Sequence, residues 1–248
     1  MEGLVTEREY TVHYYEIDYK RRALITSIMD FLGDVAMVQT EESSIDLDFL
    51  QKNKIAWVLY KWDIKIERYP HYREKIKVRT YAYGMKKYYA YRKFEIIDAD
   101  ENVIVTAVSI WFLLDIEKRK PITIPDYMYD IYKIDKSEKK SLKIDKIKKL
   151  EKIDEENKFT VRYGDIDTNK HVNNVKYVSW AIETVPKEIV TNYELKGLKV
   201  VYEKETTYGN IIKVRTEVIN EDEKLVCIHK IEDKNGNELA TLETEWGR

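Results

Sequence analysis

Apolar residues recur at helical spacing in two separate stretches of the chain, and each stretch predicts a helix with one buried face. The first stretch contains Ile25, Ile28, Met29, Leu32, Val35 and Ala36. The second contains Val175, Val178, Ile182 and Val185, and Pro186 fits the end of that helix. Each predicted helix therefore carries an apolar stripe that must be buried against another element.

Alternating apolar and polar residues follow the predicted helices and indicate antiparallel strands. The residues from Ile212 to Val218 alternate as expected of a strand with one buried face. Asn235-Gly236 is a typical hairpin turn. Residues 103–114 are nearly all apolar, so we expect that strand to be covered on both faces. One helix followed by antiparallel strands predicts an α+β fold in which the sheet wraps round the helix.

The two halves of the chain resemble each other in three segments that occur in the same order. Residues 10–18, 76–80 and 98–105 match residues 159–167, 212–216 and 233–240. The offsets are 149, 136 and 135, so they drift by only the length of a loop. This ordered similarity predicts a duplicated domain.

A basic stretch separates the two predicted copies. We expect a first domain over residues 1–135, a charged linker over 136–157 and a second domain over 158–248. Residues 117–152 contain 12 Lys or Arg and seven Asp or Glu, a local net charge of +5. Most of this stretch is expected to be a solvated connector, partly helical; the alternative is a docking patch for an acidic protein.

The composition narrows the classes of function. The chain has 248 residues, of which 44% are hydrophobic and 35% charged, with a net charge of −2, so neither nucleic acid nor an anionic membrane is an expected partner. We expect no signal peptide and no stable membrane insertion. The single cysteine, Cys227, cannot form an intrachain disulfide and favours a reducing compartment, here the cytoplasm. With only four histidines besides, neither a metal nor a cofactor is expected.

Three polar residues in the second copy form a candidate reactive centre. Asp167, Asn169 and His171 are spaced by two, so in an extended segment their side chains share one face, about 7 Å apart per step. Asn173 and Asn174 then begin the predicted helix, where Asn is a favoured N-cap. The start of a helix offers unpaired N–H groups and positive potential to a developing anion.

The first copy lacks this set of side chains. At the offset of 149, Asp167, Asn169 and His171 correspond to Asp18, Lys20 and Arg22. Only the second copy therefore has an amide and an imidazole at these positions. A purely structural role would be required in both copies, so the asymmetry favours chemistry in the second.

The run Asp-x-Asn-x-His-Val-Asn-Asn, followed by Val175-Lys176-Tyr177 and Trp180, resembles the acyl-acyl carrier protein (acyl-ACP) thioesterases of plants and bacteria. Those proteins have tandem hotdog domains, so the resemblance implies two such domains, each an antiparallel sheet wrapped round a central helix. It also implies catalytic roles for Asp167, Asn169 and His171. A later Tyr-x-x-Glu pattern supplies a fourth residue, which here is Glu205.

The mechanism implied is attack by water on a thioester, without a covalent intermediate. Many relatives carry Cys directly after that Glu, but this chain has Thr206, which rules out a cysteine acyl-enzyme at this position if the resemblance holds. Glu205 would act as general base, together with His171. Asn169, His171 and a helix N–H would hold the oxyanion, and Asp167 would orient Asn169 or His171. Cys227 lies in a predicted strand and is expected in the core.

Each candidate also has an ordinary structural interpretation. His171 and Asn169 could be turn residues, and Glu205 could be a charge that faces solvent. Asp165 shares the alternation of Asp167, so it is either the orienting carboxylate or a stabiliser of the local turn.

The resemblance implies hydrolysis of fatty acyl-ACP to free fatty acid, and hence a place in fatty acid biosynthesis, with acyl carrier protein as partner. Met29 and Leu32 are expected to line an acyl pocket, and Asn174 to contact substrate; the alternative is that Met29 and Leu32 are only core. The alternative functions are an acyl-CoA thioesterase, a non-catalytic acyl-thioester-binding protein and a hotdog dehydratase. A homodimer is left open.

Overall fold

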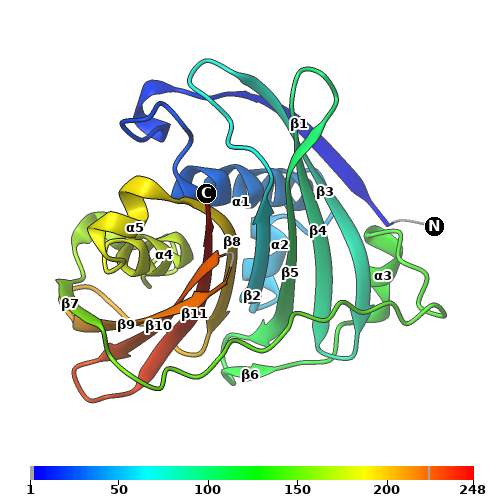
Figure 1. The fold of residues 1–248 in the computed structure, drawn as a ribbon. Coiled ribbons are helices and arrows are strands. Elements are labelled where there is room, and N and C mark those ends of the chain that lie inside the picture. The colour runs from blue at the N-terminus through cyan, green and yellow to red at the C-terminus, as the bar shows by residue number, and fades with distance from the viewer. Residues whose placement is uncertain (1–2, 223) are drawn as a thin grey trace. The chain divides into compact units, whose positions relative to one another are not determined.

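The computed structural model describes residues 3–222 and 224–248, which divide into two units. The first unit runs up to Tyr60 and resumes over Glu67–Ile144, and the second comprises Lys61–Ile66 and Asp145–Arg248. Figure 1 shows that each unit contains strands of a sheet and a principal helix. Within the described residues, no helix is both long and apolar enough to cross a lipid bilayer.

The first unit places a long helix against an antiparallel sheet. Its strands are β1 (Val5–Thr11), β2 (Ile55–Ile66), β3 (Lys75–Lys86), β4 (Tyr89–Ile97), β5 (Val103–Asp115) and β6 (Lys120–Pro121). Its helices are η1 (Tyr14–Glu16), α1 (Ile25–Glu41), α2 (Leu47–Lys52) and α3 (Asp126–Ile131). The strands are ordered β1-β3-β4-β5-β2, and β6 pairs with β5.

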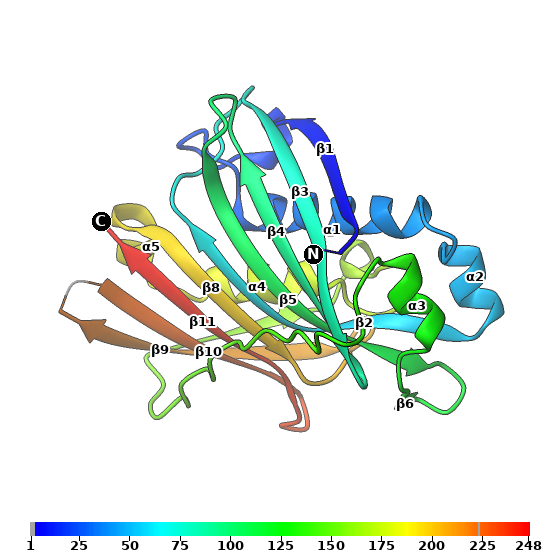
Figure 2. The ribbon, with the colours of Figure 1, turned by 90° about the vertical axis from the view of Figure 1, so that its right-hand side faces the viewer.

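Helix α1 confirms the first predicted helix and packs on β1 and β3 (Figure 2). All six apolar residues of the sequence pattern are buried. Gln39 is buried too, and its amide group donates to the Leu4 carbonyl and the Thr6 hydroxyl. The helix therefore packs through its apolar stripe and reaches β1 through a satisfied polar group.

The second unit repeats this plan. Its elements are β7 (Glu155–Thr160), η2 (Tyr163–Asp165), α4 (Asn174–Ile182), α5 (Lys187–Asn192), β8 (Glu194–Tyr202), β9 (Ile211–Glu221), β10 (Lys224–Asp233) and β11 (Glu238–Gly247). The strands are ordered β8-β11-β10-β9-β7, and Lys61–Lys65 of β2 pairs with β8. Helix α4 packs on β9, β10 and β11. The α+β prediction of a helix on an antiparallel sheet is thus confirmed in both units.

The end of the second helix differs from the prediction. Helix α4 stops at Ile182, and Pro186 is the N-cap of a separate short helix, α5. Proline is tolerated at the start of a helix because its missing N–H has no partner there. The proline therefore begins a helix instead of ending one.

The three matched segments adopt matched structures. In the β4–β5 hairpin, Asp98 N donates to Asn102 O at 2.9 Å, and in the β10–β11 hairpin Asp233 N donates to Asn237 O at 3.0 Å. Each turn has one left-handed residue, Glu101 with φ 63° and Gly236 with φ 80°. The offset of 135 therefore relates equivalent backbone positions, as the duplication predicts.

The end of the predicted linker is exposed to solvent, as expected, but its backbone is attached to the second unit. Residues 148–152 lie on the second unit's sheet, held by buried carboxylates: Glu217 accepts from the N–H groups of Glu151 (2.6 Å) and Lys152 (3.3 Å), and Glu243 accepts from that of Lys148 (3.3 Å). The apolar-polar alternation of β9 consequently breaks at Glu217, which is 6% exposed. We call residues 148–154 the strap; β7 starts within the predicted linker, at Glu155.

Candidate active site

The segment from Asp167 to His171 is a tight turn, so the predicted extended conformation is wrong. Asp167 N donates to His171 O at 2.8 Å, and Lys170 N donates to Asp167 O at 3.1 Å. Lys170 adopts the left-handed conformation with φ 65°. The side chain of an aspartate can bind nearby backbone N–H groups and so favours a turn over a strand.

The Asp167 carboxylate anchors this turn. Its Oδ1 accepts from the backbone N–H of Asn169 (2.8 Å) and of His171 (3.3 Å). Asp18 does the same in the first unit, accepting from the N–H of Lys20 (2.8 Å) and of Arg22 (3.0 Å). Because both copies have the anchor, it belongs to the scaffold, and Asp167 positions its neighbours through the backbone.

His171 and Glu205 are brought into contact by a hydrogen bond between their segments. Val172 N donates to Thr206 O at 2.9 Å, which fixes the turn beside the chain that follows β8. His171 Nδ1 then lies 3.3 Å from Glu205 Oε2. The side chains are 30% and 45% exposed, so both can reach a bound molecule. An imidazole and a carboxylate in contact are a common general-base arrangement.

The start of helix α4 lies next to this pair along the chain. The side chain of Asn173 caps the helix by accepting from Val175 N at 3.0 Å, as predicted for an asparagine at this position. The hydroxyl of Tyr202 donates to the carbonyl of Asn174 at 3.0 Å and ties the first helical residue to β8. The remaining N–H groups of the first turn carry positive potential.

Asn169 and Asp165 occupy different environments from His171. The side chain of Asn169 is exposed, and its amide makes no hydrogen bond with any residue that the structure describes. Asp165 is 1% exposed and accepts from the N–H of Arg162 at 2.8 Å and from its guanidinium at 3.1 Å. Asp165 therefore stabilises the η2 turn, which decides between its two sequence interpretations.

The predicted substrate-binding residues lie in both units. Met29 and Leu32 are buried on the inner face of α1. Asn174 is the first residue of α4 and is half-buried. The burial of Met29 and Leu32 is expected of residues in either a core or an acyl pocket.

The single cysteine lies away from solvent on β10. Cys227 is fully buried, and burial raises the pKa of its thiol to about 11. At neutral pH the group is a thiol and not the nucleophilic thiolate. Among the described residues, no group of three or more His, Cys, Asp or Glu is arranged to hold a metal ion.

In the first unit, the positions that correspond to His171 and Glu205 make different side-chain contacts. Ala23 N donates to Pro70 O at 2.8 Å, the counterpart of the Val172–Thr206 bond. The guanidinium of Arg22 lies 5.1 Å from the centre of the Tyr69 ring, in place of the His171–Glu205 contact, and also pairs with Asp18 at 3.0 Å. The offsets thus match contacts as well as sequence.

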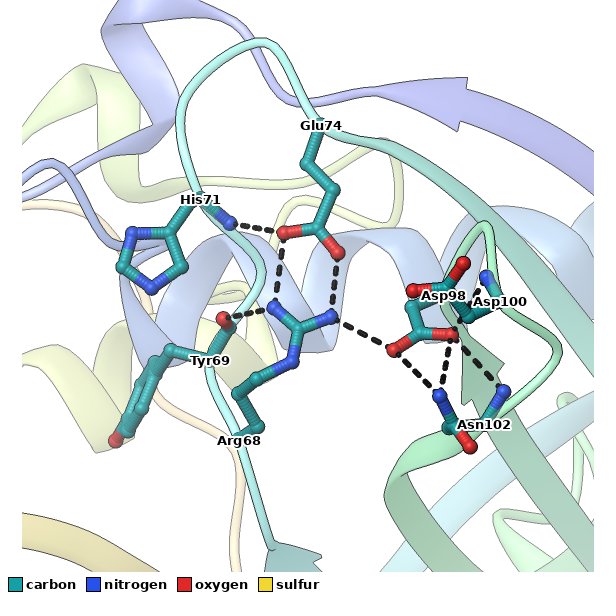
Figure 3. A network of polar contacts seen from close by, with 7 residues as sticks. All are labelled: Arg68, Tyr69, His71, Glu74, Asp98, Asp100 and Asn102. Carbon is teal, nitrogen blue, oxygen red and sulfur yellow. Dashed lines mark hydrogen bonds and ion pairs between the residues drawn. The ribbon is translucent and has the colours of Figure 1, made fainter.

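Ion pairs also stabilise the region around Tyr69 in the first unit. Figure 3 shows Arg68, next to Tyr69, bridging Glu74 (2.6 Å) and Asp98 (3.0 Å). Asp98 in turn accepts from Asn102 within its hairpin. The second unit has Lys204 and Asn210 at the positions of Arg68 and Glu74 and cannot form this bridge. The first unit therefore uses the region for structure.

Comparison with known proteins assigns both units. Residues 3–132 match the family model of the acyl-ACP thioesterase N-terminal domain, and residues 147–248 that of the C-terminal domain. An acyl-[acyl-carrier-protein] hydrolase of Cuphea viscosissima is 27% identical over 99% of this chain. A dodecanoyl-[acyl-carrier-protein] hydrolase of Umbellularia californica is also 27% identical over 99% of this chain and 68% of its own length. Both relatives are described as chloroplastic, and this chain spans 63% of the Cuphea protein.

Solved structures share the fold. A protein of Lactobacillus plantarum, provisionally described as an oleoyl thioesterase, has a TM-score of 0.93 at 24% identity, covering 99% of this chain and 96% of its own. The 12:0-ACP thioesterase of Umbellularia californica has a TM-score of 0.85 at 24% identity, covering 98% and 93%. These similarities confirm the double-hotdog fold implied by the sequence. Since the two family models match nearly all of its length, the chain belongs to the acyl-ACP thioesterase family.

Proposed function

We propose that this protein hydrolyses fatty acyl-ACP thioesters and releases free fatty acid. The observation that carries this proposal is the His171–Glu205 contact of 3.3 Å, in a family whose relatives are acyl-ACP hydrolases. The first unit has Arg22 and Tyr69 at these positions, which provide neither an imidazole nor a carboxylate.

Water is the nucleophile in the proposed reaction. Glu205, supported by His171, takes a proton from the water as its oxygen bonds to the thioester carbonyl carbon. The carbon–sulfur bond then breaks, the thiolate leaves, and the proton is returned to its sulfur. A thiolate is a fair leaving group, and the buried thiol of Cys227 takes no part.

The oxyanion is stabilised by nearby hydrogen-bond donors. We assign this role to the exposed Asn169 amide, His171 and an N–H of the first turn of α4, and Asp167 holds the first two through their backbone. Removing one such donor typically costs about 3–4 kcal/mol of transition-state stabilisation.

The wider setting follows from the same family assignment. We propose that acyl carrier protein is the partner, that Met29 and Leu32 line the acyl pocket and that Asn174 contacts substrate. We also propose that residues 1–135 and 158–248 form the two domains and that the protein takes part in fatty acid biosynthesis. Because Cys227 is a free thiol, we propose a reducing compartment such as the cytoplasm. A homodimer is compatible with these assignments.

The test measures thiol release from acyl-ACP and acyl-CoA substrates of graded chain length. His171→Ala and Glu205→Gln should each lower kcat by at least about 100-fold, the usual contribution of a general base. His71→Ala, an exposed histidine in the first unit, is the matched control and should be unchanged. Near-parental rates for both variants would show that His171 and Glu205 are not the active site. Faster hydrolysis of acyl-CoA than of acyl-ACP would identify acyl-CoA as the substrate.

A further inference from the structure

Tyr177 carries a buried hydroxyl without a hydrogen-bond partner. The side chain is 2% exposed, and its oxygen is one of two buried side-chain polar atoms without a partner among the described residues. Native proteins satisfy nearly all buried polar groups, and an orphan costs stability. Such a group therefore requires an explanation beyond packing.

The first unit shows that the fold does not need this hydroxyl. At the offset of 149, Tyr177 corresponds to Ile28, which lies at the same place in α1 and is fully buried. An aliphatic side chain fills this position without any unsatisfied atom. Tyrosine thus occurs only in the copy that holds His171 and Glu205, as do the other proposed reactive side chains.

The surroundings of Tyr177 place its hydroxyl at the candidate active site. Tyr177 lies in the first turn and a half of α4, and its ring packs at 5.8 Å on that of Tyr202, three residues before Glu205. Burial raises the pKa of the Tyr177 hydroxyl above its usual value; the nearby backbone N–H of Thr206 acts in the opposite direction, and the negative charges of Glu205 and Asp167 add to the rise. The hydroxyl therefore stays protonated and is available as a donor.

We propose that the Tyr177 hydroxyl donates a hydrogen bond to the thioester carbonyl oxygen as this becomes an oxyanion. The proposal rests on the proposed hydrolysis and adds a donor to it. A hydroxyl that lacks a partner in the free protein gains one when the substrate is bound. The unpaired hydroxyl lowers the stability of the free protein, but it provides a donor that is already in place when the oxyanion forms.

Tyr177→Phe separates this role from a structural one. Since the hydroxyl proton has no acceptor in the free protein, the unfolding midpoint should stay the same or rise. kcat for acyl-ACP should fall by roughly 10–100-fold with little change in KM, because the donor acts mainly in the transition state. Activity within twofold of the parent protein would overturn the proposal, and so would a loss explained by a lower unfolding midpoint.

Tyr202→Phe is the matched control. The Tyr202 hydroxyl has a partner, the Asn174 carbonyl at 3.0 Å, so its removal should lower the unfolding midpoint by a few degrees and reduce kcat less than Tyr177→Phe does. The reverse order of the two variants, in stability or in kcat, would also overturn the proposal. Hydrolysis by the parent protein and its loss in His171→Ala test the proposed function separately, whatever the result for Tyr177.

Discussion

His229 is fully buried on β10, where its ring nitrogens contact two hydroxyls. Nδ1 lies 2.8 Å from the Thr216 oxygen and Nε2 lies 3.0 Å from the Thr244 oxygen. Burial lowers the pKa of this histidine to about 3. The ring is therefore neutral in the folded protein and takes up a proton near its ordinary pKa only after unfolding.

This burial predicts acid-sensitive stability. Between about pH 6.5 and pH 3 the unfolded chain binds one more proton at His229 than the folded chain does. The contribution of His229 to the free energy of unfolding should thus be constant above pH 6.5 and fall by about 1.4 kcal/mol per pH unit below it. Denaturant unfolding at several pH values measures this slope.

His229→Phe is the control, because the first unit has Phe94 at the same position. Its unfolding free energy should lose this one-proton slope between pH 6.5 and 5. An unchanged slope would assign the acid sensitivity to other groups.

Asp18 and Asp167 play the same structural role in the two units, but we expect their replacement to affect activity differently. Each anchors a turn by accepting two backbone hydrogen bonds, so Asp18→Ala and Asp167→Ala should each lower the free energy of unfolding by about 1–2 kcal/mol. Only Asp167→Ala should also reduce kcat, because only its turn carries Asn169 and His171. Equal loss of activity in both variants would show that turn stability alone controls the rate.

Among the elements, the strap depends on the buried carboxylates of Glu217 and Glu243. Glu217→Ala removes the acceptor of two strap N–H groups and should release residues 148–154 from the sheet. Trypsin should then cut faster after Lys148, Lys149 and Lys152. Glu156→Ala, which breaks a more exposed ion pair with Arg215, should leave the cleavage rate unchanged. Equal rates in all three proteins would mean that other contacts hold the strap.

The regular elements were predictable from sequence, and the strap and turns were not. Helical spacing and strand alternation depend on the burial of side chains on one face, so they marked α1, α4 and β9. The strap depends on backbone N–H groups that meet Glu217 and Glu243, residues about 65 to 95 positions away, and no local pattern records such contacts. Spacing by two predicts an extended segment at Asp167 and does not reveal Lys170, whose left-handed conformation makes the segment a turn.

At the scale of the whole molecule, comparison of the two copies predicts that hydrolysis can be abolished without unfolding the protein. Replacing Asn169, His171 and Glu205 by their first-copy counterparts Lys, Arg and Tyr should abolish thiol release and leave the unfolding midpoint within a few degrees. The converse variant, Lys20→Asn with Arg22→His, should keep full activity. Loss of activity in the converse variant would place part of the reaction in the first unit.

The candidate site was predictable in part, because duplication provides an internal comparison. The offset of 136 paired Glu205 with Tyr69, and the structure gives the two pairs, His171 with Glu205 and Arg22 with Tyr69, equivalent contacts. The same comparison pairs Tyr177 with Ile28, a polar residue at a core position, but sequence alone cannot show that the hydroxyl lacks a partner. The catalytic roles themselves stay predictions until the variants are measured.

The nearly identical backbone hydrogen bonds of the two turns, Val172 to Thr206 and Ala23 to Pro70, have an evolutionary consequence. In a symmetric dimer encoded by one short gene, every mutation alters both subunits at once. Joining two copies in one gene lets each half change independently, so one turn can carry arginine and tyrosine while the other carries histidine and glutamate. A tandem chain can therefore carry two different sets of side chains on two turns with the same backbone hydrogen bond.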